Sequence, residues 1–235
     1  MFVYGVCVGP SGKFEAACGP SLERYGFEPV ILRRHQRSIF EAYVSMMDEA
    51  SDRWPDLEGL VLLHDDVVIE DDCIETNLRR LFRSGRTGIV GVVGGTGHDE
   101  LSWWKTDERF GHCRMATHVD EYSRGDHEVS TVDGLFMALS PPAVQLLSRS
   151  LRQGGYPAWH GYDSEMCRLV RQAGLSVLVS DFELFHDCKR GPWGRAEYGQ
   201  AIMEWWLRSS EGGIRQRVAW KMKRHLLATA ARLGR

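Results

Sequence analysis

Short apolar runs recur along the first hundred residues and predict buried strands. Each run stops at glycine, proline or polar residues, which commonly punctuate strands. The predicted strands are residues 2–9, 28–34, 57–64 and 87–97, the last of which runs into a glycine-rich loop. The run 57–64 is apolar almost throughout, which is typical of a parallel strand covered on both faces.

Amphipathic stretches lie between these runs and predict helices. Over residues 38–54, Ser38 and Glu41 fit a capping box that precedes apolar residues at helical spacing. A second helix over 70–85 has acids in its first turn and arginines in its last. The alternation predicts an α/β fold with a mostly parallel central sheet flanked by helices. Such sheets bind ligands beyond the carboxyl ends of their strands.

The pattern changes after residue 100. Residues 100–128 are polar, aromatic and irregular, which indicates a hairpin or an excursion over the sheet. Apolar periodicity then predicts a strand over 129–140, a helix over 141–151, a helix beginning within 156–174, and a last strand over 175–187. We expect one domain over residues 1–192 and a helical extension over 193–235.

Composition bounds the class of protein. Hydrophobic residues make up 43% of the chain and charged residues 26%, which is ordinary for a soluble globular protein. The net charge of −3 gives no basic field, so no nucleic-acid partner is expected. The six cysteines form no C-x-x-C pair. No stretch reads as a secretory signal or membrane span, so we expect a cytoplasmic protein with reduced thiols.

The most informative polar cluster ends the strand 57–64. His64, Asp65 and Asp66 stand at its predicted carboxyl end. Adjacent carboxylates repel each other and are costly to desolvate, which points to a bound cation. Divalent cations prefer carboxylate oxygens and commonly carry phosphate. The alternative is that these acids cap the next helix, although residues 70–72 already supply acids there.

Two later positions suit the same chemistry. Asp163 begins a predicted helix, where the dipole stabilises a carboxylate, and it could act as a general base. The alternative is a helix cap without chemistry. His186 follows the last strand and could complete a metal site, with Lys189 and Arg190 beside it to neutralise phosphate. A histidine at such a position is otherwise structural.

Aromatic residues are candidates for stacking on a sugar ring. Trp159 and His160 stand just before Asp163. The other candidates are Trp103, Trp104 and Trp193. The alternative for each tryptophan is ordinary packing, which we expect for at least two of them.

Two basic segments need separate interpretation. "GPSGK" at residues 9–13 resembles a P-loop, but Cys7 replaces the first glycine and Phe14 the final Ser or Thr, so we exclude that motif. The segment still leaves the carboxyl end of the first strand and could contact a nucleotide. Residues 213–235 carry seven Lys or Arg, no acid and apolar residues at helical spacing. They predict a basic amphipathic helix that either lies on an anionic membrane or packs on the domain.

The order of these pieces resembles the family-2-like glycosyltransferases with a GT-A fold, from residue 2 to residue 190. The segments that carry the resemblance read "LLHDDVVIEDDCI", "VSTVDGLFMALS", "HGYDSEMCRLVRQAGLSVLV" and "LFHD". The chain departs from the family pattern at His64, where the first Asp of D-x-D is usual, and at Tyr162, where the Glu of E-D is usual. The first loop also lacks the usual "P-x-[YF]-N".

This resemblance implies roles for particular residues. It assigns Asp66 and His186 to a divalent metal, Mn²⁺ or Mg²⁺, and Asp163 to the catalytic base. The implied nucleotide contacts are Gly9, Pro10, Ser11 and Asp65. The implied diphosphate or sugar contacts are Asp133, Gly134, Trp159, His160, Lys189 and Arg190.

The resemblance also implies an activity. A sugar would move from a nucleotide-diphosphate donor to a hydroxyl of a saccharide or lipid-linked acceptor, with inversion, in polysaccharide biosynthesis. The location would be cytoplasmic, extending to the inner face of the membrane if residues 213–235 bind lipid. Two alternatives stay open: a nucleotidyltransferase acting on a sugar phosphate, and a non-catalytic sugar-binding module on the same fold.

Overall fold

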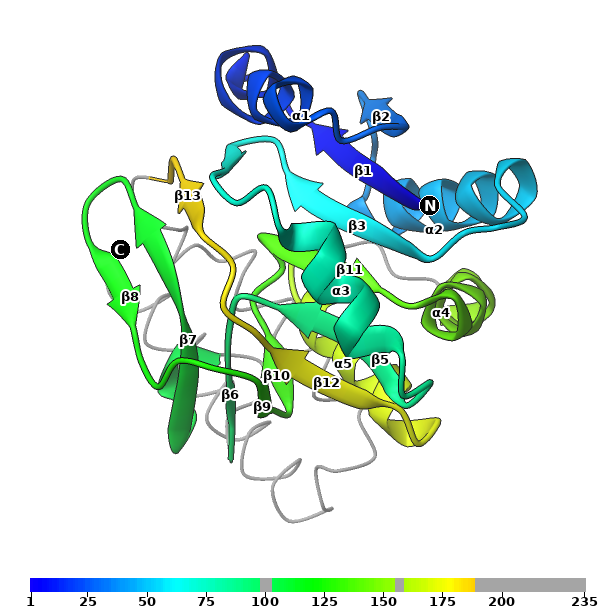
Figure 1. Ribbon diagram of the computed structural model, residues 1–235. Coiled ribbons are helices and arrows are strands. Elements are labelled where there is room, and N and C mark those ends of the chain that lie inside the picture. The colour runs from blue at the N-terminus through cyan, green and yellow to red at the C-terminus, as the bar shows by residue number, and fades with distance from the viewer. Residues whose placement is uncertain (98–102, 155–158, 189–235) are drawn as a thin grey trace, which may run out of the picture. The chain divides into compact units, whose positions relative to one another are not determined.

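The structure of the protein is a computed structural model that describes residues 1–97, 103–154 and 159–188 (Figure 1). Its centre is a sheet in the order β2-β1-β3-β11-β5-β12-β9. The strands of this sheet are β1 (Phe2–Val8), β2 (Val30–Arg34), β3 (Gly59–His64), β5 (Thr87–Gly91), β9 (His127–Glu128), β11 (Phe136–Leu139) and β12 (Ser176–Val179). The α/β class expected from the sequence is confirmed.

The large sheet is parallel at one end and mixed beyond it. β1 pairs in parallel with β2 and with β3, as the early apolar runs predict. β11 then enters antiparallel between β3 and β5. Parallel neighbours need a long crossover, usually a helix, and β11 arrives instead from a short turn at Asp133 and Gly134.

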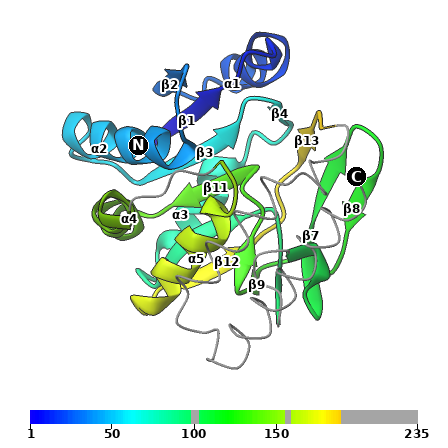
Figure 2. The ribbon, with the colours of Figure 1, turned by 180° about the vertical axis from the view of Figure 1, so that it is seen from behind.

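Helices cover both faces of this sheet. On one face lie α2 (Ile39–Arg53), α4 (Pro141–Gly154) and α5 (Tyr162–Gln172), and on the other α1 (Gly19–Tyr25) and α3 (Ile74–Phe82) (Figures 1 and 2). β3 shows why its sequence is apolar throughout. Leu60 and Leu62 pack into the core beneath α2, α4 and α5, while Val61 and Leu63 pack into the opposite core. Burial on both faces identifies β3 as an interior strand, and its end carries the polar cluster.

The helix predicted over 38–54 is α2. The side chain of Ser38 accepts a hydrogen bond from the backbone of Phe40 at 3.2 Å and so caps the first turn. Tyr43, Met46 and Met47 form its fully buried face.

A second sheet packs beside the first, in the order β10-β6-β7-β13-β4, with β8 paired to β7. Its strands are β4 (Val67–Ile69), β6 (Val93–Thr96), β7 (Glu108–Met115), β8 (Val119–Glu121), β10 (Thr131–Val132) and β13 (Leu184–His186). Three predicted strands, 87–97, 129–140 and 175–187, each divide between the two sheets. The hairpin expected within 100–128 is β7–β8. Two short helical turns, η1 (Phe14–Cys18) and η2 (Trp103–Lys105), complete the described elements.

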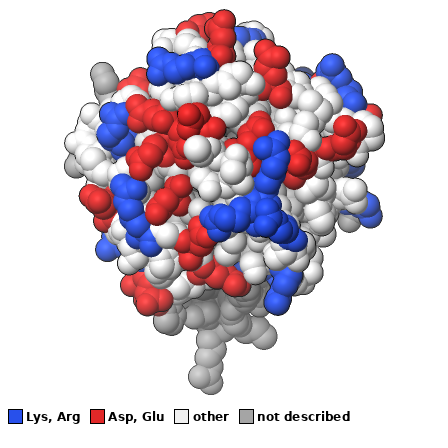
Figure 3. Space-filling model, in the orientation of Figure 1, with Lys and Arg blue, Asp and Glu red and all other residues white. Residues whose placement is uncertain are grey.

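Charged side chains of both signs lie close together on the face shown in Figure 3. The ion pairs of the structure include Arg79 with Glu58 and Arg80 with Asp126. Among the described helices, none is both long and apolar enough to span a bilayer.

Candidate active site

The acidic pair predicted at the end of β3 fills the turn between β3 and β4. Asp65 and Asp66 therefore stand where the two sheets meet, at the carboxyl end of β3. They do not cap α3. That helix begins at Ile74, and Asp71 accepts a hydrogen bond from the backbone of Cys73 at 2.7 Å just before it. The acids of residues 70–72 and the pair at 65–66 are thus separate features.

Asp65 holds the loop that follows β1. Its Oδ2 accepts a hydrogen bond from the backbone of Gly9 at 2.7 Å. A Cβ atom at Gly9 would lie 3.3 Å from the same oxygen, so the close approach favours glycine. Gly9, Pro10 and Ser11 are exposed. The structure thus brings the predicted nucleotide-contact residues of this loop together with Asp65.

Asp66 joins three parts of the chain. His186 Nε2, at the end of β13, donates to Asp66 Oδ1 at 3.0 Å, and Lys13 Nζ donates to Oδ2 at 3.2 Å. The Lys13 ammonium also donates to the backbone carbonyl of Asp187. Burial alone would raise the pKa of Asp66, but the hydrogen bond and charge of His186, together with the hydrogen bond from Lys13, hold it well below its usual range. Asp66 is therefore an anion at any physiological pH.

His64 links this carboxylate to the start of α5. Its Nε2 lies 2.5 Å from Tyr162 Oη, and its ring centroid lies 5.6 Å from that of His186. Burial, followed by the charge of His186, lowers the pKa of His64, which favours a neutral imidazole. One ligand atom from each of His64, Asp66 and His186 lies within 4.8 Å of the others.

Two glycines allow Tyr162 to reach this position. Gly161, at the amino end of α5, has φ of 75°, a conformation that favours glycine. Gly134, between β10 and β11, faces the tyrosine ring, and a Cβ atom there would lie only 2.1 Å from Tyr162 Oη. The phenol therefore occupies the space that any other residue at 134 would fill.

Asp163 follows Tyr162 and stands near a second acid. Its Oδ1 accepts a hydrogen bond from the backbone of Ser164 at 2.8 Å. Burial and the charge of Asp133 raise the pKa of Asp163 to about 7, although backbone hydrogen bonds from Ser164 and Gly134 oppose the shift. Trp103 Nε1 donates to Asp133 Oδ2 at 2.7 Å and so orients the neighbouring acid.

Other predicted site residues lie around this cluster or apart from it. Trp103 is buried, and its ring meets Trp104 and Tyr122 edge to face. Packing of this kind is the alternative that we expected for part of the tryptophan set. Trp159 is 45% exposed just before α5, and His160 follows it. Lys189, Arg190, Trp193 and the predicted extension 193–235 lie outside the described residues.

Glu165, the second acid at the start of α5, is held in an ion pair. Both of its carboxylate oxygens accept hydrogen bonds from the Arg168 guanidinium, at 2.7 and 2.8 Å, in a buried pair.

Two contacts were not anticipated from the sequence. Lys13, set aside with the P-loop interpretation, reaches the acidic pair, and Tyr162 pairs with His64 from a distance of 98 positions along the chain. The position of residues 9–13 after the first strand could have suggested the first contact. No local spacing predicts the second.

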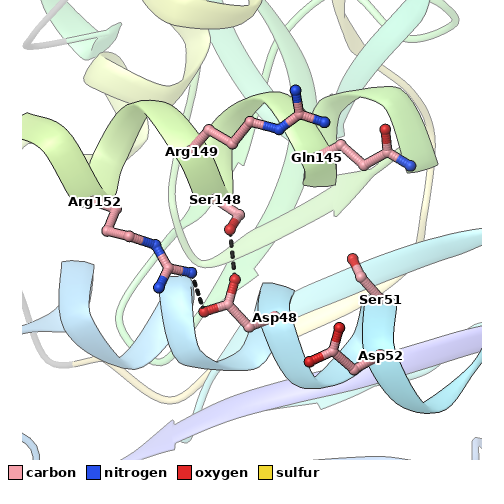
Figure 4. A pocket seen from close by; sticks show the side chains of 7 residues that line it. All are labelled: Asp48, Ser51, Asp52, Gln145, Ser148, Arg149 and Arg152. Carbon is pink, nitrogen blue, oxygen red and sulfur yellow. Dashed lines mark hydrogen bonds and ion pairs between the residues drawn. The ribbon is translucent and has the colours of Figure 1, made fainter.

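A separate surface pocket of about 380 Å³ lies between α2 and α4 (Figure 4). In it Asp48 accepts hydrogen bonds from Ser148 and Arg152, both at 2.5 Å. None of the predicted site residues lines this pocket.

Solved structures share the fold at low sequence identity. One is a mannosyltransferase, PcManGT from Pyrobaculum calidifontis, solved with GDP-Man and Mn²⁺. The match covers 90% of this chain and 64% of the PcManGT chain, with a TM-score of 0.55 and 13% sequence identity. GalNAc-T7, solved with UDP, GalNAc and Mn²⁺, matches 87% of this chain and 47% of its own, with a TM-score of 0.53 and 10% identity. These similarities establish the GT-A fold.

Sequence comparison establishes the family. The model of a glycosyltransferase-like family matches residues 23–201. The streptomycin biosynthesis protein StrF of Streptomyces griseus is 33% identical over 210 residues, which are 87% of this chain and 73% of StrF. The chain therefore belongs to the glycosyltransferase-like family and is a glycosyltransferase with a GT-A fold.

Proposed function

We propose that this glycosyltransferase transfers a sugar from a nucleotide-diphosphate donor to an acceptor hydroxyl, with inversion and with a divalent cation. One observation carries the proposal. A set of metal-type ligands, His64, Asp66 and His186, is connected through the His64–Tyr162 contact to Asp163, a carboxylate with a pKa of about 7. Inverting sugar transfer needs both a charge-stabilising group and a base near neutral pH.

The ligand set fits a divalent cation. His186 Nε2 is bonded to Asp66, and its buried Nδ1 has no hydrogen-bond partner among the described residues. His64 would donate from Nε2 to Tyr162 Oη and present the lone pair of Nδ1, as ligating histidines commonly do. One carboxylate and two imidazoles suit Mn²⁺ better than Mg²⁺, which favours oxygen ligands. When bound, the cation would stabilise negative charge on the diphosphate leaving group.

Asp163 is the proposed general base. It would take the proton of the acceptor hydroxyl as that oxygen bonds to the anomeric carbon, while the bond from this carbon to the diphosphate oxygen breaks on the opposite face. The displacement inverts the anomeric centre. Burial and Asp133 keep the pKa of Asp163 near the pH at which it must accept a proton.

Asp65 and the loop after β1 form the proposed nucleotide side of the site. Asp65 would contact the ribose, and Gly9, Pro10 and Ser11, which it anchors, would lie against the nucleotide. The similar structures were solved with GDP-Man and with UDP, two different nucleotides. The donor assay therefore includes both guanosine and uridine nucleotides.

The acceptor side of the site has its own proposed contacts. Asp133, Gly134, Trp159 and His160 are the described residues proposed to contact sugar or diphosphate, and Lys189 and Arg190 have the same proposed role outside the described part. Proposed acceptors are saccharides and lipid-linked saccharides. StrF is named for streptomycin biosynthesis, so small hydroxylated biosynthetic intermediates also belong in the acceptor panel.

A donor panel tests the proposal directly. Purified full-length protein is incubated with UDP-, GDP- and dTDP-sugars and Mn²⁺, with and without an acceptor panel. We expect slow release of free sugar from one donor, accelerated transfer with one acceptor, and loss of both with chelator. Pyrophosphate production from a nucleoside triphosphate and a sugar phosphate would instead establish the nucleotidyltransferase. Silence in both assays would favour the non-catalytic module.

Peripheral membrane contact through residues 213–235 is a separate part of the proposal. The full-length protein should sediment with vesicles containing anionic lipid at low salt and be released at high salt, because screening weakens surface attraction. Vesicles of neutral lipid are the control. If the protein stays in solution with both vesicle types, this part of the proposal is wrong.

A further inference from the structure

Lys13 places its ammonium group against Asp66, the carboxylate of the proposed metal site. Its Nζ donates to Asp66 Oδ2 at 3.2 Å and lies 3.7 Å from Asp187 Oδ2. We infer that Lys13 is a built-in counter-ion, which neutralises Asp66 until a divalent cation arrives and then turns to the donor diphosphate. The inference rests on the proposed function and adds a diphosphate-binding residue that the sequence motifs do not assign.

Competition for Asp66 follows from its contacts. Oδ1 is engaged by His186 and Oδ2 by Lys13, so both carboxylate oxygens already have a donor. A cation that binds Oδ2 is repelled by the ammonium beside it, so metal binding favours displacement of Lys13. Lys13 therefore opposes metal binding in the free protein.

The charge around the site explains where the ammonium would go. The acids near the proposed donor position are Asp65, Asp66, Asp133, Asp163 and Asp187. An anionic diphosphate entering this field is repelled unless cations offset it. Once a metal neutralises Asp66, the released ammonium is an available partner for phosphate oxygen.

The side chain has the freedom to make this change. Lys13 follows the exposed loop 9–11, and 32% of its side-chain surface is exposed. Its long flexible stem lets the ammonium move while the backbone stays in place. The same side chain connects the β1 loop to the end of β13 through Asp187. Displacing it would therefore release one contact between these two segments as the donor binds.

The first experiment measures Mn²⁺ binding to the donor-free protein by calorimetry. Lys13→Met should bind Mn²⁺ about 3–5-fold more tightly than wild type, the size of effect expected for a partly exposed ion pair. Lys13→Arg, which keeps the charge, should stay near wild type. Lys105→Met, at an exposed lysine outside the site, is the matched control. Circular dichroism checks that each variant is folded.

The second experiment measures nucleotide binding at saturating Mn²⁺. Whichever of UDP, GDP and dTDP binds wild type most tightly serves as the probe. Lys13→Met should weaken its binding about tenfold, because a charge-assisted contact to phosphate is lost. The two effects therefore have opposite signs: tighter metal and weaker nucleotide. A residue that merely supports the fold would weaken both.

The outcomes separate this inference from the proposed function. If wild type binds Mn²⁺ and nucleotide but Lys13→Met changes neither more than Lys105→Met does, the counter-ion role is wrong and the proposed function stands. Weakening of both ligands in Lys13→Met likewise overturns it, since the lysine is then structural. If wild type binds Mn²⁺ neither alone nor in the presence of nucleotide, the metal-dependent function and this inference fail together.

Discussion

Asp163 and Glu165 stand two positions apart in the first turn of α5, yet their surroundings differ sharply. Glu165 is paired on both oxygens with Arg168, whereas Asp163 lies beside another acid and has a raised pKa. We expect Asp163→Asn to reduce sugar transfer by about 10²–10⁴-fold, the usual contribution of a general base, with nucleotide affinity nearly unchanged. Initial rates and calorimetry measure the two quantities.

Glu165→Gln is the matched control from the same turn. The substitution takes away the carboxylate that the Arg168 guanidinium contacts at 2.7 and 2.8 Å in a buried ion pair, so the free energy of unfolding should fall by on the order of 3 kcal/mol. Turnover by the folded fraction should stay near wild type. Normal turnover in Asp163→Asn would remove the base assignment, and a larger rate loss in Glu165→Gln would reverse the two roles.

The pKa of Asp163 predicts the acid limb of the pH profile. A general base works only when deprotonated, so transfer should fall as pH drops below about 7, the value that burial and Asp133 impose. Asp133→Asn removes the neighbouring negative charge and keeps an acceptor for Trp103. Its acid limb should therefore move to lower pH. Initial rates measured from pH 5 to pH 9 check this shift. If the acid limb does not move, Asp133 does not set the pKa of the base.

Individual residues were predictable where the chemistry is local. Asp65 and Asp66 could be singled out because they follow a buried strand while other acids serve the next helix, and Asp163 because it begins a helix beside aromatic residues. The contacts of Lys13 and Tyr162 could not, because each depends on a partner more than fifty positions away along the chain. Tertiary packing brings the start of α5 and the end of β13 to the carboxyl end of β3, where these contacts form.

At the level of elements, periodicity located the strands but not where they change sheet. The segments 87–97, 129–140 and 175–187 each read as one apolar run, because a strand keeps its pattern when it crosses between packed sheets. The strands divide at Val92, at residues 133–135 and at residues 180–183. A Cβ atom at Gly91 would lie 2.6 Å from Val132 Cβ, which shows how closely the two sheets approach. That closeness depends on tertiary packing, which a single sequence does not display.

The break at Gly134 carries a prediction about how β11 and α5 fit together. In Gly134→Ala the added Cβ would clash with Tyr162 Oη, so the start of α5 must shift. We expect a loss of about 1–3 kcal/mol in the free energy of unfolding, as for other overpacked sites, and a large loss of transfer activity. Chemical denaturation and initial rates measure these effects.

Gly26→Ala is the control for this substitution. Gly26 ends α1 with φ of 65°, and no heavy atom lies within 4 Å of the position that a Cβ atom would take there. Alanine therefore adds backbone strain of about 1 kcal/mol and no clash. It should lower stability without lowering turnover. If Gly134→Ala behaves in the same way, the approach of Tyr162 to this glycine does not position the site.

For the molecule as a whole, the proposed metal site lies across the boundary between the two sheets. Asp66 stands between β3 of the large sheet and β4 of the small one, and His186 ends β13 of the small sheet. A cation bound by both residues would join the sheets in the folded state. Because unfolding separates the ligands, metal binding should stabilise the entire fold rather than one loop.

This position predicts a metal-dependent melting temperature. Mn²⁺ at about 100 times its Kd should add about 2.7 kcal/mol to the free energy of unfolding, which raises Tm by roughly 5–10 °C for a chain of this size. Mg²⁺ at the same concentration should give a smaller shift, because two of the three ligands are imidazoles. His186→Gln should abolish the Mn²⁺ shift, whereas His118→Gln, in the exposed β7–β8 hairpin, should retain it.

Scanning calorimetry after chelator treatment sets the metal-free baseline. Equal shifts from both metals would argue against imidazole ligation, and a full Mn²⁺ shift in His186→Gln would place the cation elsewhere. Since no sugar donor enters this measurement, it tests the bridge between the sheets independently of catalysis.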